Sequence, residues 1–177
     1  MARVLAGDIA AYEGIVERWQ RRLINLAWRF CREREMAEDM AQEVFLKAFR
    51  SLSTFRGDAA FSTWLTAIAV NTYRSRIRAD GLPLGSVDVA QVSSAVAGPL
   101  AGMIEVERDE SVRRAVLALP ERYREALLLF YFEEKSVPDA ARVLGIAEGT
   151  LKARLHRGRE LLREKYEKSW GKAKEDR

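Results

Sequence analysis

The stretch SVPDAARVLGIAEGTLKARLHRGRELLR, residues 136–163, predicts two helices joined by a tight turn. Ser136 is a favourable N-cap for the first of them. Gly145 can adopt the left-handed conformation that commonly closes a helix, so the first helix is expected to end there. Ile146 then fills the turn, and Glu148 suits the positive end of a second helix. The pattern is that of a helix-turn-helix, whose second helix commonly lies in the DNA major groove.

The second predicted helix has two chemically different faces. At about 100° per residue, one apolar stripe should pack inward, and it comprises Leu151, Leu155, Gly158 and Leu162. The outer side and its flanks carry Gly149, Thr150, Lys152, Ala153, His156, Arg157 and Glu160. Small residues would let this helix approach a groove closely, and its basic side chains could then reach guanine edges. The competing interpretation is a solvated basic helix, because charged outer faces are common.

The composition is that of a globular protein, with 177 residues of which 48% are hydrophobic and 32% are charged. A net charge of +4 permits nucleic-acid binding without requiring it. Cys31 is the single cysteine and His156 the single histidine, so neither an intrachain disulfide nor a Cys/His zinc site is expected. Cofactor motifs, catalytic constellations, a signal peptide and membrane-spanning runs are not recognisable. We therefore expect a non-enzymatic, cytoplasmic protein without cofactors or stable membrane insertion.

The N-terminal part of the chain predicts a long amphipathic helix followed by a second one. The first is capped by Asp8, and a break is expected near residues 20–22 because helices this long are uncommon. Its apolar stripe comprises Ile9, Tyr12, Val16, Trp19, Leu23, Leu26 and Phe30. The second helix covers residues 36–52, and its inner stripe comprises Met40, Val44, Ala48 and Leu52, with Phe45 and Phe49 beside them. Its outer side is left with Asp39, Gln42, Glu43 and Leu46.

A third helix is predicted over residues 61–78, and its character changes along its length. Its first half is aromatic and apolar, with Phe61 and Trp64, and its second half carries Arg74 and Arg78. Aromatic rings followed by a basic end suit single-stranded nucleic acid, because bases stack on rings while arginines hold phosphates. On composition alone, the favoured interpretation is that the two aromatic residues belong to the core.

Glycine, proline and serine mark a boundary between two halves of the chain. We expect an all-α fold of two small helical domains, residues 1–80 and residues 105–177. A flexible linker at residues 81–104 joins them, since this segment has almost no charge and no sustained hydrophobic period. The C-terminal domain contains the helix-turn-helix.

The helix-turn-helix is expected to pack against a small helical bundle. Helices are predicted over residues 106–119 and 123–132, separated by Pro120. The second of these is apolar nearly all round, which is typical of a central, buried helix. Beyond Glu167 the polar tail is expected to fray.

Three segments taken together resemble bacterial RNA polymerase sigma factors of the extracytoplasmic-function (ECF) group. They are AEDMAQEVFLKAF (37–49), FRGDAAFSTWLTAIAVNT (55–72) and LPERYREALLLFYFEEKSVPDAARVLGIAEGTLKARLHRGRELL (119–162). The similarity covers nearly all of residues 8–80 and 106–166, in the family's order. It implies a two-domain, dissociable subunit that directs the core polymerase to promoters and melts them.

The resemblance also assigns residues to three surfaces. The family's docking surface for the clamp helices of the largest core subunit is matched by Asp39, Gln42, Glu43, Phe45 and Leu46. The family segment that captures the melted −10 strand holds a flipped base in a pocket, and Asn71 matches a residue that lines this pocket. The residues that match this segment are Phe55, Arg56, Phe61, Ser62, Trp64, Asn71, Arg74 and Arg78. The −35 reader is matched by Thr150, Lys152, Ala153, Arg154, His156 and Arg157. The implied partners are the core polymerase (clamp helices and flap region), duplex and single-stranded promoter DNA, and an anti-sigma factor.

Two other functions fit parts of the same sequence. A stand-alone helix-turn-helix regulator with a helical sensor domain would bind a palindrome as a dimer, without polymerase. A helical scaffold with an incidental basic helix would not read DNA. Two positions also depart from the family's pattern, because Ala153 stands where a small hydroxylic residue is common and Ser75 replaces an acidic residue. These departures leave the promoter sequence open.

Overall fold

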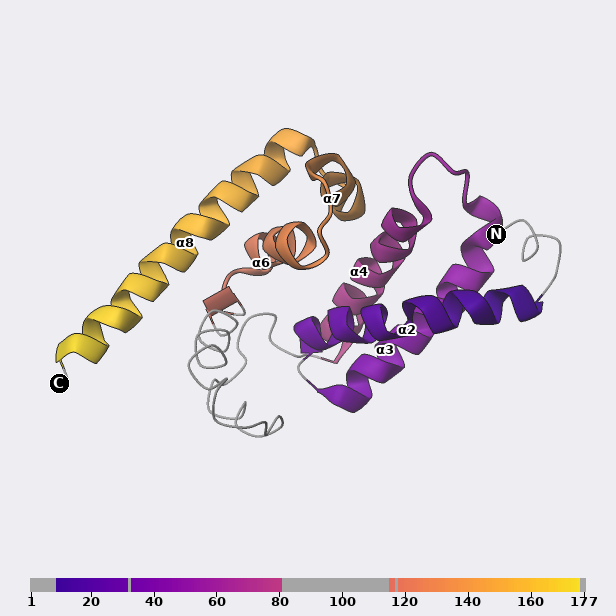
Figure 1. Cartoon of the computed structure of the whole chain (residues 1–177), viewed down its shortest axis with the longest axis horizontal. Helices are drawn as coiled ribbons and strands as arrows, with labels where there is room; N and C mark the ends of the chain where they lie inside the picture. The colour runs from indigo at the N-terminus through magenta and orange to yellow at the C-terminus, as the bar shows by residue number, and fades with distance from the viewer. Residues whose placement is uncertain (1–8, 32, 81–114, 117, 176–177) are drawn as a thin grey trace. The chain divides into compact units, whose positions relative to one another are not determined.

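The computed structural model describes residues 9–31, 33–80, 115–116 and 118–175. Within this described part every regular element is a helix and no strand is present, which confirms the all-α prediction (Figure 1). The chain divides into two compact units, Met1–Leu82 with Pro138–Ile146 and Pro83–Val137 with Ala147–Arg177. We describe the elements of each unit separately.

The first unit begins with α2, which is one continuous helix over Ile9–Cys31. The break expected at residues 20–22 was wrong, because good helix formers occupy that stretch and the apolar stripe continues through it. The C-terminal half of α2 is the better buried half: Leu23, Leu26, Ala27 and Phe30 are each 7% exposed or less. Burial of this half against neighbouring helices stabilises a helix longer than average.

Helix α3 covers Arg34–Ser51 and begins at an unexpected cap. The carboxylate of Glu33 accepts hydrogen bonds from the backbone N–H groups of Glu35 and Met36, which satisfies two donors at the helix start. The predicted inner stripe is confirmed, since Met40, Val44, Ala48 and Leu52 are all buried. A short 3₁₀ turn, η1 (Leu52–Thr54), follows α3 and leads into an irregular loop.

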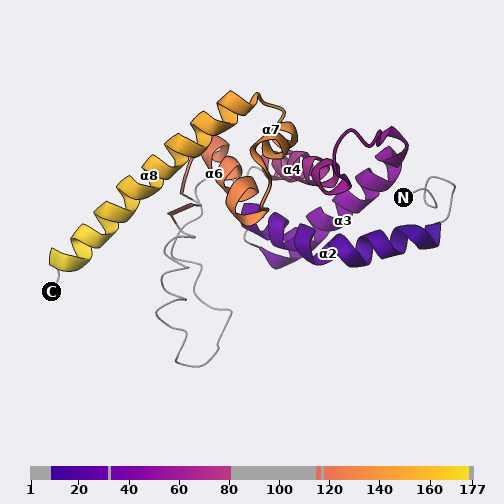
Figure 2. The same cartoon turned by 45° about the horizontal axis from the view of Figure 1, so that its top comes forward.

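Helix α4 covers Phe61–Ala79 and agrees with its predicted bounds to within one residue. Tyr73 is fully buried at its centre, and its hydroxyl donates to the Leu23 carbonyl oxygen at 3.0 Å. The Tyr73 ring also meets the Phe30 ring edge-on at 5.5 Å. Helices α2, α3 and α4 each contact the other two, so they form a three-helix core around these side chains (Figures 1 and 2).

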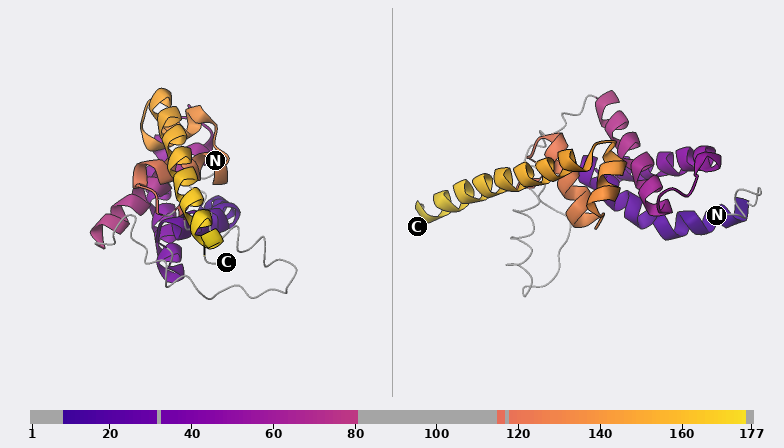
Figure 3. Two further views of the ribbon diagram at one scale, coloured as in Figure 1. Left: turned by 90° about the vertical axis from the view of Figure 1, so that its left-hand side faces the viewer. Right: turned by 90° about the horizontal axis from the view of Figure 1, so that it is seen from above.

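The second unit contains α6 (Glu121–Leu127), the π-helical segment η4 (Leu128–Phe132) and α8 (Glu148–Glu175). The helix predicted over 123–132 thus begins two residues earlier and changes type halfway. The wider π turn keeps Leu128 and Leu129 buried but leaves Tyr131 51% exposed, so the segment is not buried on all sides. Helix α8 continues without interruption to Glu175 (Figure 3). The fraying that the sequence predicted beyond Glu167 is therefore not seen in its backbone.

Helix α7 covers Val137–Leu144, and the predicted turn after it is confirmed. Gly145 has φ 65°, in the left-handed region. Its N–H donates to the Arg142 carbonyl oxygen at 3.2 Å, and the Ile146 N–H donates to the Ala141 carbonyl oxygen at 3.0 Å. This pair of hydrogen bonds is the Schellman motif, which ends a helix and redirects the chain.

Several predictions fall outside the described residues. They concern the Asp8 cap, the linker at residues 81–104 and most of the helix at 106–119. The domain boundaries therefore stay predictions. Among the helices that the structure does describe, none is long and apolar enough to cross a membrane.

Candidate nucleic-acid interface

Four aromatic side chains form a continuous cluster where the loop after η1 meets α4. Phe55 and Phe61 meet edge-on at 5.7 Å, and Trp64 lies 5.3 Å from Phe55 and 5.5 Å from Phe61. Trp19 of α2 joins the cluster through Phe61, at 6.2 Å. All four rings are partly exposed. A partly exposed aromatic cluster can pack internally on one side and stack on a ligand from the other.

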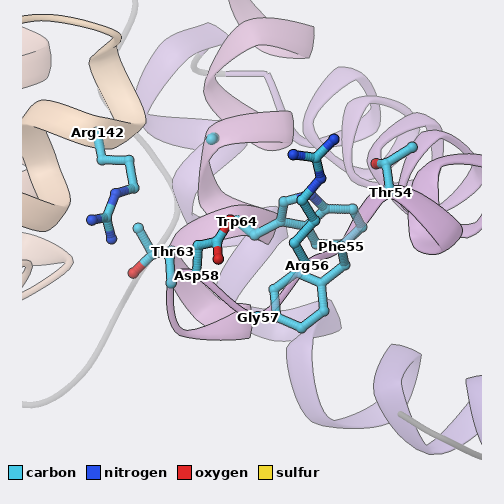
Figure 4. A pocket seen from close by; sticks show the side chains of 10 residues that line it. Thr54, Phe55, Arg56, Gly57, Asp58, Thr63, Trp64 and Arg142 are labelled. Carbon is cyan, nitrogen blue, oxygen red and sulfur yellow. The ribbon is translucent and has the colours of Figure 1, made fainter.

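A pocket opens beside this cluster (Figure 4). Within residues 54–67 its lining comprises Thr54, Phe55, Arg56, Gly57, Asp58, Ala59, Thr63, Trp64 and Ala67. Gly57, with φ 79°, allows the loop to bend around the opening. The sequence singled out Phe55, Arg56 and Trp64 but missed the small residues, since nothing in their type indicates a cavity. Apolar rings, an arginine and a carboxylate around one hollow suit a flat, polar-edged ligand such as a base.

Asn71, which the sequence placed in this pocket, does not line it. It is exposed on α4 seven residues after Trp64, about 10 Å further along the helix axis. Arg78 is also exposed near the end of α4, and Arg74 is partly exposed. Ser62, at the start of α4, is partly exposed and likewise not among the lining residues. The residues predicted to bind −10 DNA therefore fall into two groups: some line the pocket, and Asn71, Arg74 and Arg78 lie further along α4.

The outer side of α3 presents acidic, amide and apolar groups together. Asp39 and Gln42 are exposed, and Leu46 is 59% exposed. Glu43 is half-buried and pairs with Lys47 at 2.7 Å. Phe45 differs from the rest of the predicted set, because it is only 7% exposed and its ring belongs to the core. It supports this surface from beneath and does not offer its ring to a partner.

Helix α8 presents the predicted basic surface to solvent. Thr150, Lys152, Ala153, His156 and Arg157 are exposed, and Arg154 is partly exposed. The inward stripe is also confirmed, with Leu151, Leu155 and Gly158 buried and Leu162 partly buried.

Arg157 pairs with two carboxylates that the sequence did not identify as its partners. Its guanidinium donates to Glu160 at 3.0 Å and lies 3.6 Å from Glu164. The hydrogen bond to Glu160 raises the pKa of Arg157, and the same bond lowers the pKa of Glu160. His156 lies 3.7 Å from the same Glu160 oxygen. The spacing of three and four residues along a helix was the available signal for these pairs.

The chemistry of these surfaces is that of binding. Among the residues that the structure describes, no group of three or more His, Cys, Asp or Glu side chains could hold a metal ion. What the chain offers is an aromatic pocket, a basic helix and an acidic, apolar helix face. Aromatic, basic and mixed acidic–apolar surfaces of these kinds are typical of sites that bind nucleic acids or proteins.

Comparison with known proteins identifies the two halves of the chain. Residues 15–81 match the family model for sigma-70 region 2, and residues 109–162 match the model for sigma-70 region 4. The first match spans the aromatic pocket and the acidic surface of α3. The second spans both α7 and α8, so it treats the helix-turn-helix as one motif.

Individual relatives match almost the whole chain. The RNA polymerase sigma-H factor of Pseudomonas aeruginosa is 35% identical over 170 residues, which cover 90% of this chain and 88% of the relative. The ECF sigma factor SigW of Bacillus subtilis is 33% identical over 171 residues, covering 91% of both chains. The ECF sigma-E factor of Escherichia coli K12 is 33% identical over 175 residues, covering 93% of this chain and 91% of the relative.

Solved structures agree with these relatives. CnrH in complex with the cytosolic domain of CnrY matches with a TM-score of 0.68 and 25% identity, covering 94% of both chains. The sigma factor RpoE of Bartonella quintana, in complex with the anti-sigma factor NepR, matches with a TM-score of 0.67 and 26% identity, covering 87% of this chain and 95% of that one. The chain therefore belongs to the sigma-70 family of RNA polymerase sigma factors, in its extracytoplasmic-function group.

Proposed function

We propose that this sigma factor binds the core polymerase through α3, reads duplex −35 DNA with α8 and captures the melted −10 strand at the aromatic pocket. The observation that carries the proposal is the pocket at Phe55 and Trp64, which lies in the same unit as the acidic face of α3. One small domain thereby offers a polymerase-binding surface and a base-binding site together. The predicted division into residues 1–80, 81–104 and 105–177 is part of the same proposal.

Core binding is proposed for Asp39, Gln42, Glu43 and Leu46. The exposed Leu46 supplies an apolar anchor, and the acidic groups around it supply charge complementarity for a basic partner such as the polymerase clamp helices. Contact between region 4 and the polymerase flap is proposed from family membership alone.

Promoter melting is proposed to follow from differential binding. A base in a duplex is stacked and paired, and extracting it costs a few kcal/mol. Phe55 and Trp64 can repay that cost by stacking, about 1–3 kcal/mol per base, but only for a base that has left the helix. The open strand is therefore favoured without nucleotide hydrolysis. Arg74 and Arg78 are proposed to hold phosphates along α4.

Duplex recognition is proposed for the outer side of α8. The small side chain of Ala153 lets the helix approach the groove, and its methyl group can contact a thymine methyl. Lys152 and Arg157 can each reach a guanine edge, with about 1–3 kcal/mol of discrimination per good contact. Thr150, Arg154 and His156 are proposed to contact the backbone or base edges beside them.

An anti-sigma polypeptide is a further proposed partner. The two similar solved structures, CnrH and RpoE, are complexes with the cytosolic domain of CnrY and with the anti-sigma factor NepR. Exposed apolar residues such as Leu46 and Tyr131 are suitable anchors for such a partner.

Run-off transcription with core polymerase on a promoter library tests the proposal. Holoenzyme is expected to transcribe a defined subset of sequences, whereas core polymerase alone and this protein alone are not. Transcription no greater than with core alone would overturn the proposal. Strong, specific DNA binding in the absence of core would instead favour a stand-alone regulator.

Charge reversal tests the docking surface separately. Asp39→Lys/Glu43→Lys is expected to abolish holoenzyme assembly, measured by co-elution with core. The matched control is Glu13→Lys/Glu17→Lys, which makes the same charge change at the same spacing on the exposed side of α2. Equal loss of assembly in both variants would show a general charge effect and would remove α3 from the interface.

A further inference from the structure

A basic patch on α2 lies next to the aromatic cluster and has no part in the function proposed above. Arg18, Arg21 and Arg22 fall within five consecutive residues, and all three side chains are exposed. Trp19, between them in sequence, is only partly exposed because it contacts α4. An exposed group of arginines beside an aromatic residue is typical of a surface that binds nucleic acid.

Ring contacts connect this patch to the pocket without interruption. The Arg22 guanidinium carbon lies 5.7 Å from the centre of the Trp19 ring, in a cation–π contact. Trp19 meets Phe61 edge-on at 6.2 Å, and Phe61 lies 5.5 Å from Trp64, which lines the pocket. A strand leaving the pocket therefore has partly exposed rings ahead of it, followed by a guanidinium.

Helical geometry separates the three arginines. Arg18 and Arg22 are one turn apart and about 40° apart around the helix; Arg22 is displaced from Trp19 by about 60° and Arg18 by about 100°. Arg21 lies about 160° from Trp19, on the side of α2 that faces away from the aromatic cluster. Arg22 is therefore the best placed to meet a strand that crosses Trp19, Arg18 flanks the same side, and Arg21 is the farthest from it.

We propose that Arg18 and Arg22 bind phosphates of the single-stranded promoter DNA that extends from the pocket across Phe61 and Trp19. The proposal rests on the proposed capture of a base at the pocket and extends that binding site onto α2. Single-stranded DNA is the favoured occupant because stacking rings are followed by phosphate-binding cations along one path, which suits bases and phosphates of one strand. An acidic polypeptide would use the arginines but would leave the rings without a role.

The salt dependence of binding to fork-junction DNA tests this inference. The probe carries a −35 duplex selected by run-off transcription and a single-stranded non-template extension through the −10 element. Each phosphate contact with a single strand contributes about 0.7 to the slope of log K against log salt, so Arg18→Gln/Arg22→Gln should lower the holoenzyme's slope by about 1.4. Doubling the salt concentration should then reduce the DNA-binding constant of the wild-type holoenzyme about 2.6-fold more than that of the variant holoenzyme.

Three controls make the result decisive. Arg21→Gln removes one positive charge from the same helix, half the change of the double variant, and should leave the slope within error of the wild type. Arg18→Lys/Arg22→Lys should retain the wild-type slope, since lysine also binds phosphate as a point charge. The loss should disappear on a probe whose extension stops at the captured base.

Other outcomes overturn the inference. A loss of slope in Arg21→Gln of about 0.7, half that of the double variant, would indicate a diffuse field around α2. Weaker assembly of Arg18→Gln/Arg22→Gln with core would place the arginines on the polymerase, and a lower melting temperature that lysine does not restore would make them structural. Failure of the proposed function is distinguishable from all of these, because the wild-type holoenzyme itself would then not prefer the extended probe.

Discussion

Replacing Gly158 by valine should loosen the contact between α6 and α8. A Cβ atom at Gly158 would lie 3.1 Å from Leu127 Cδ1 and 3.3 Å from Leu127 Cγ, closer than ordinary van der Waals contact. It would also lie 3.5 Å from Tyr123 Cβ, so the space is closed on two sides. Overpacking of this kind costs about 1–3 kcal/mol, and the better helix propensity of valine returns only about 0.3–0.5 kcal/mol. The expected net loss is about 0.5–2.7 kcal/mol.

Hydrogen exchange measured by mass spectrometry on peptides from α6 reports this loss locally. Exchange should accelerate about 2- to 85-fold, since about 1.4 kcal/mol corresponds to a tenfold change in an equilibrium constant. Gly149→Val is the matched control on the same helix, because no atom lies within 4 Å of a Cβ placed there. Unchanged exchange in Gly158→Val would refute the reasoning, since it would mean that α6 and α8 are not tightly packed at this position.

Three further predictions follow from single contacts. The Tyr12 hydroxyl donates to the Phe45 carbonyl oxygen at 2.6 Å, and burial raises the pKa of Tyr12 to about 12. The stability contributed by the Tyr12 hydroxyl is therefore present below about pH 10 and lost between about pH 10 and 12. Tyr12→Phe should lower the free energy of unfolding by about 1 kcal/mol in urea at pH 7 and should abolish this alkaline loss of stability. Gly145→Ala should lower the free energy of unfolding by about 1–2 kcal/mol, because the backbone φ of 65° at this position is unfavourable for a residue with a Cβ atom. The melting temperature should fall accordingly, and an unchanged melting temperature would show that the turn relaxes. Glu160→Gln should raise the affinity for duplex −35 DNA, measured by fluorescence anisotropy. The substitution releases Arg157 from its ion pair with Glu160 and removes a negative charge from the DNA-reading face of α8. Weaker binding would show that Glu160 instead positions Arg157 for its contact with DNA.

Local rules predicted the elements of this protein well. Gly145 ends α7 because only a residue without a Cβ takes the left-handed conformation at low cost, and that requirement is visible in the sequence. The stripes of α3 and α8 were equally predictable, since periodicity alone separates a buried face from an exposed one. The break expected in α2 was wrong because it rested on the average length of helices: good helix formers occupy residues 20–22, and burial of the C-terminal half stabilises the longer helix.

The sites divide in the same way. The sequence by itself determined which residue types lie on the outer sides of α3 and α8, and motifs spread over most of the chain determined the family. Only the tertiary structure decided that Asn71 is not among the residues lining the pocket and that Trp19 joins Phe61. The physical reason is that exposure along one helix follows from its period, whereas contact between residues more than 40 positions apart depends on how helices cross.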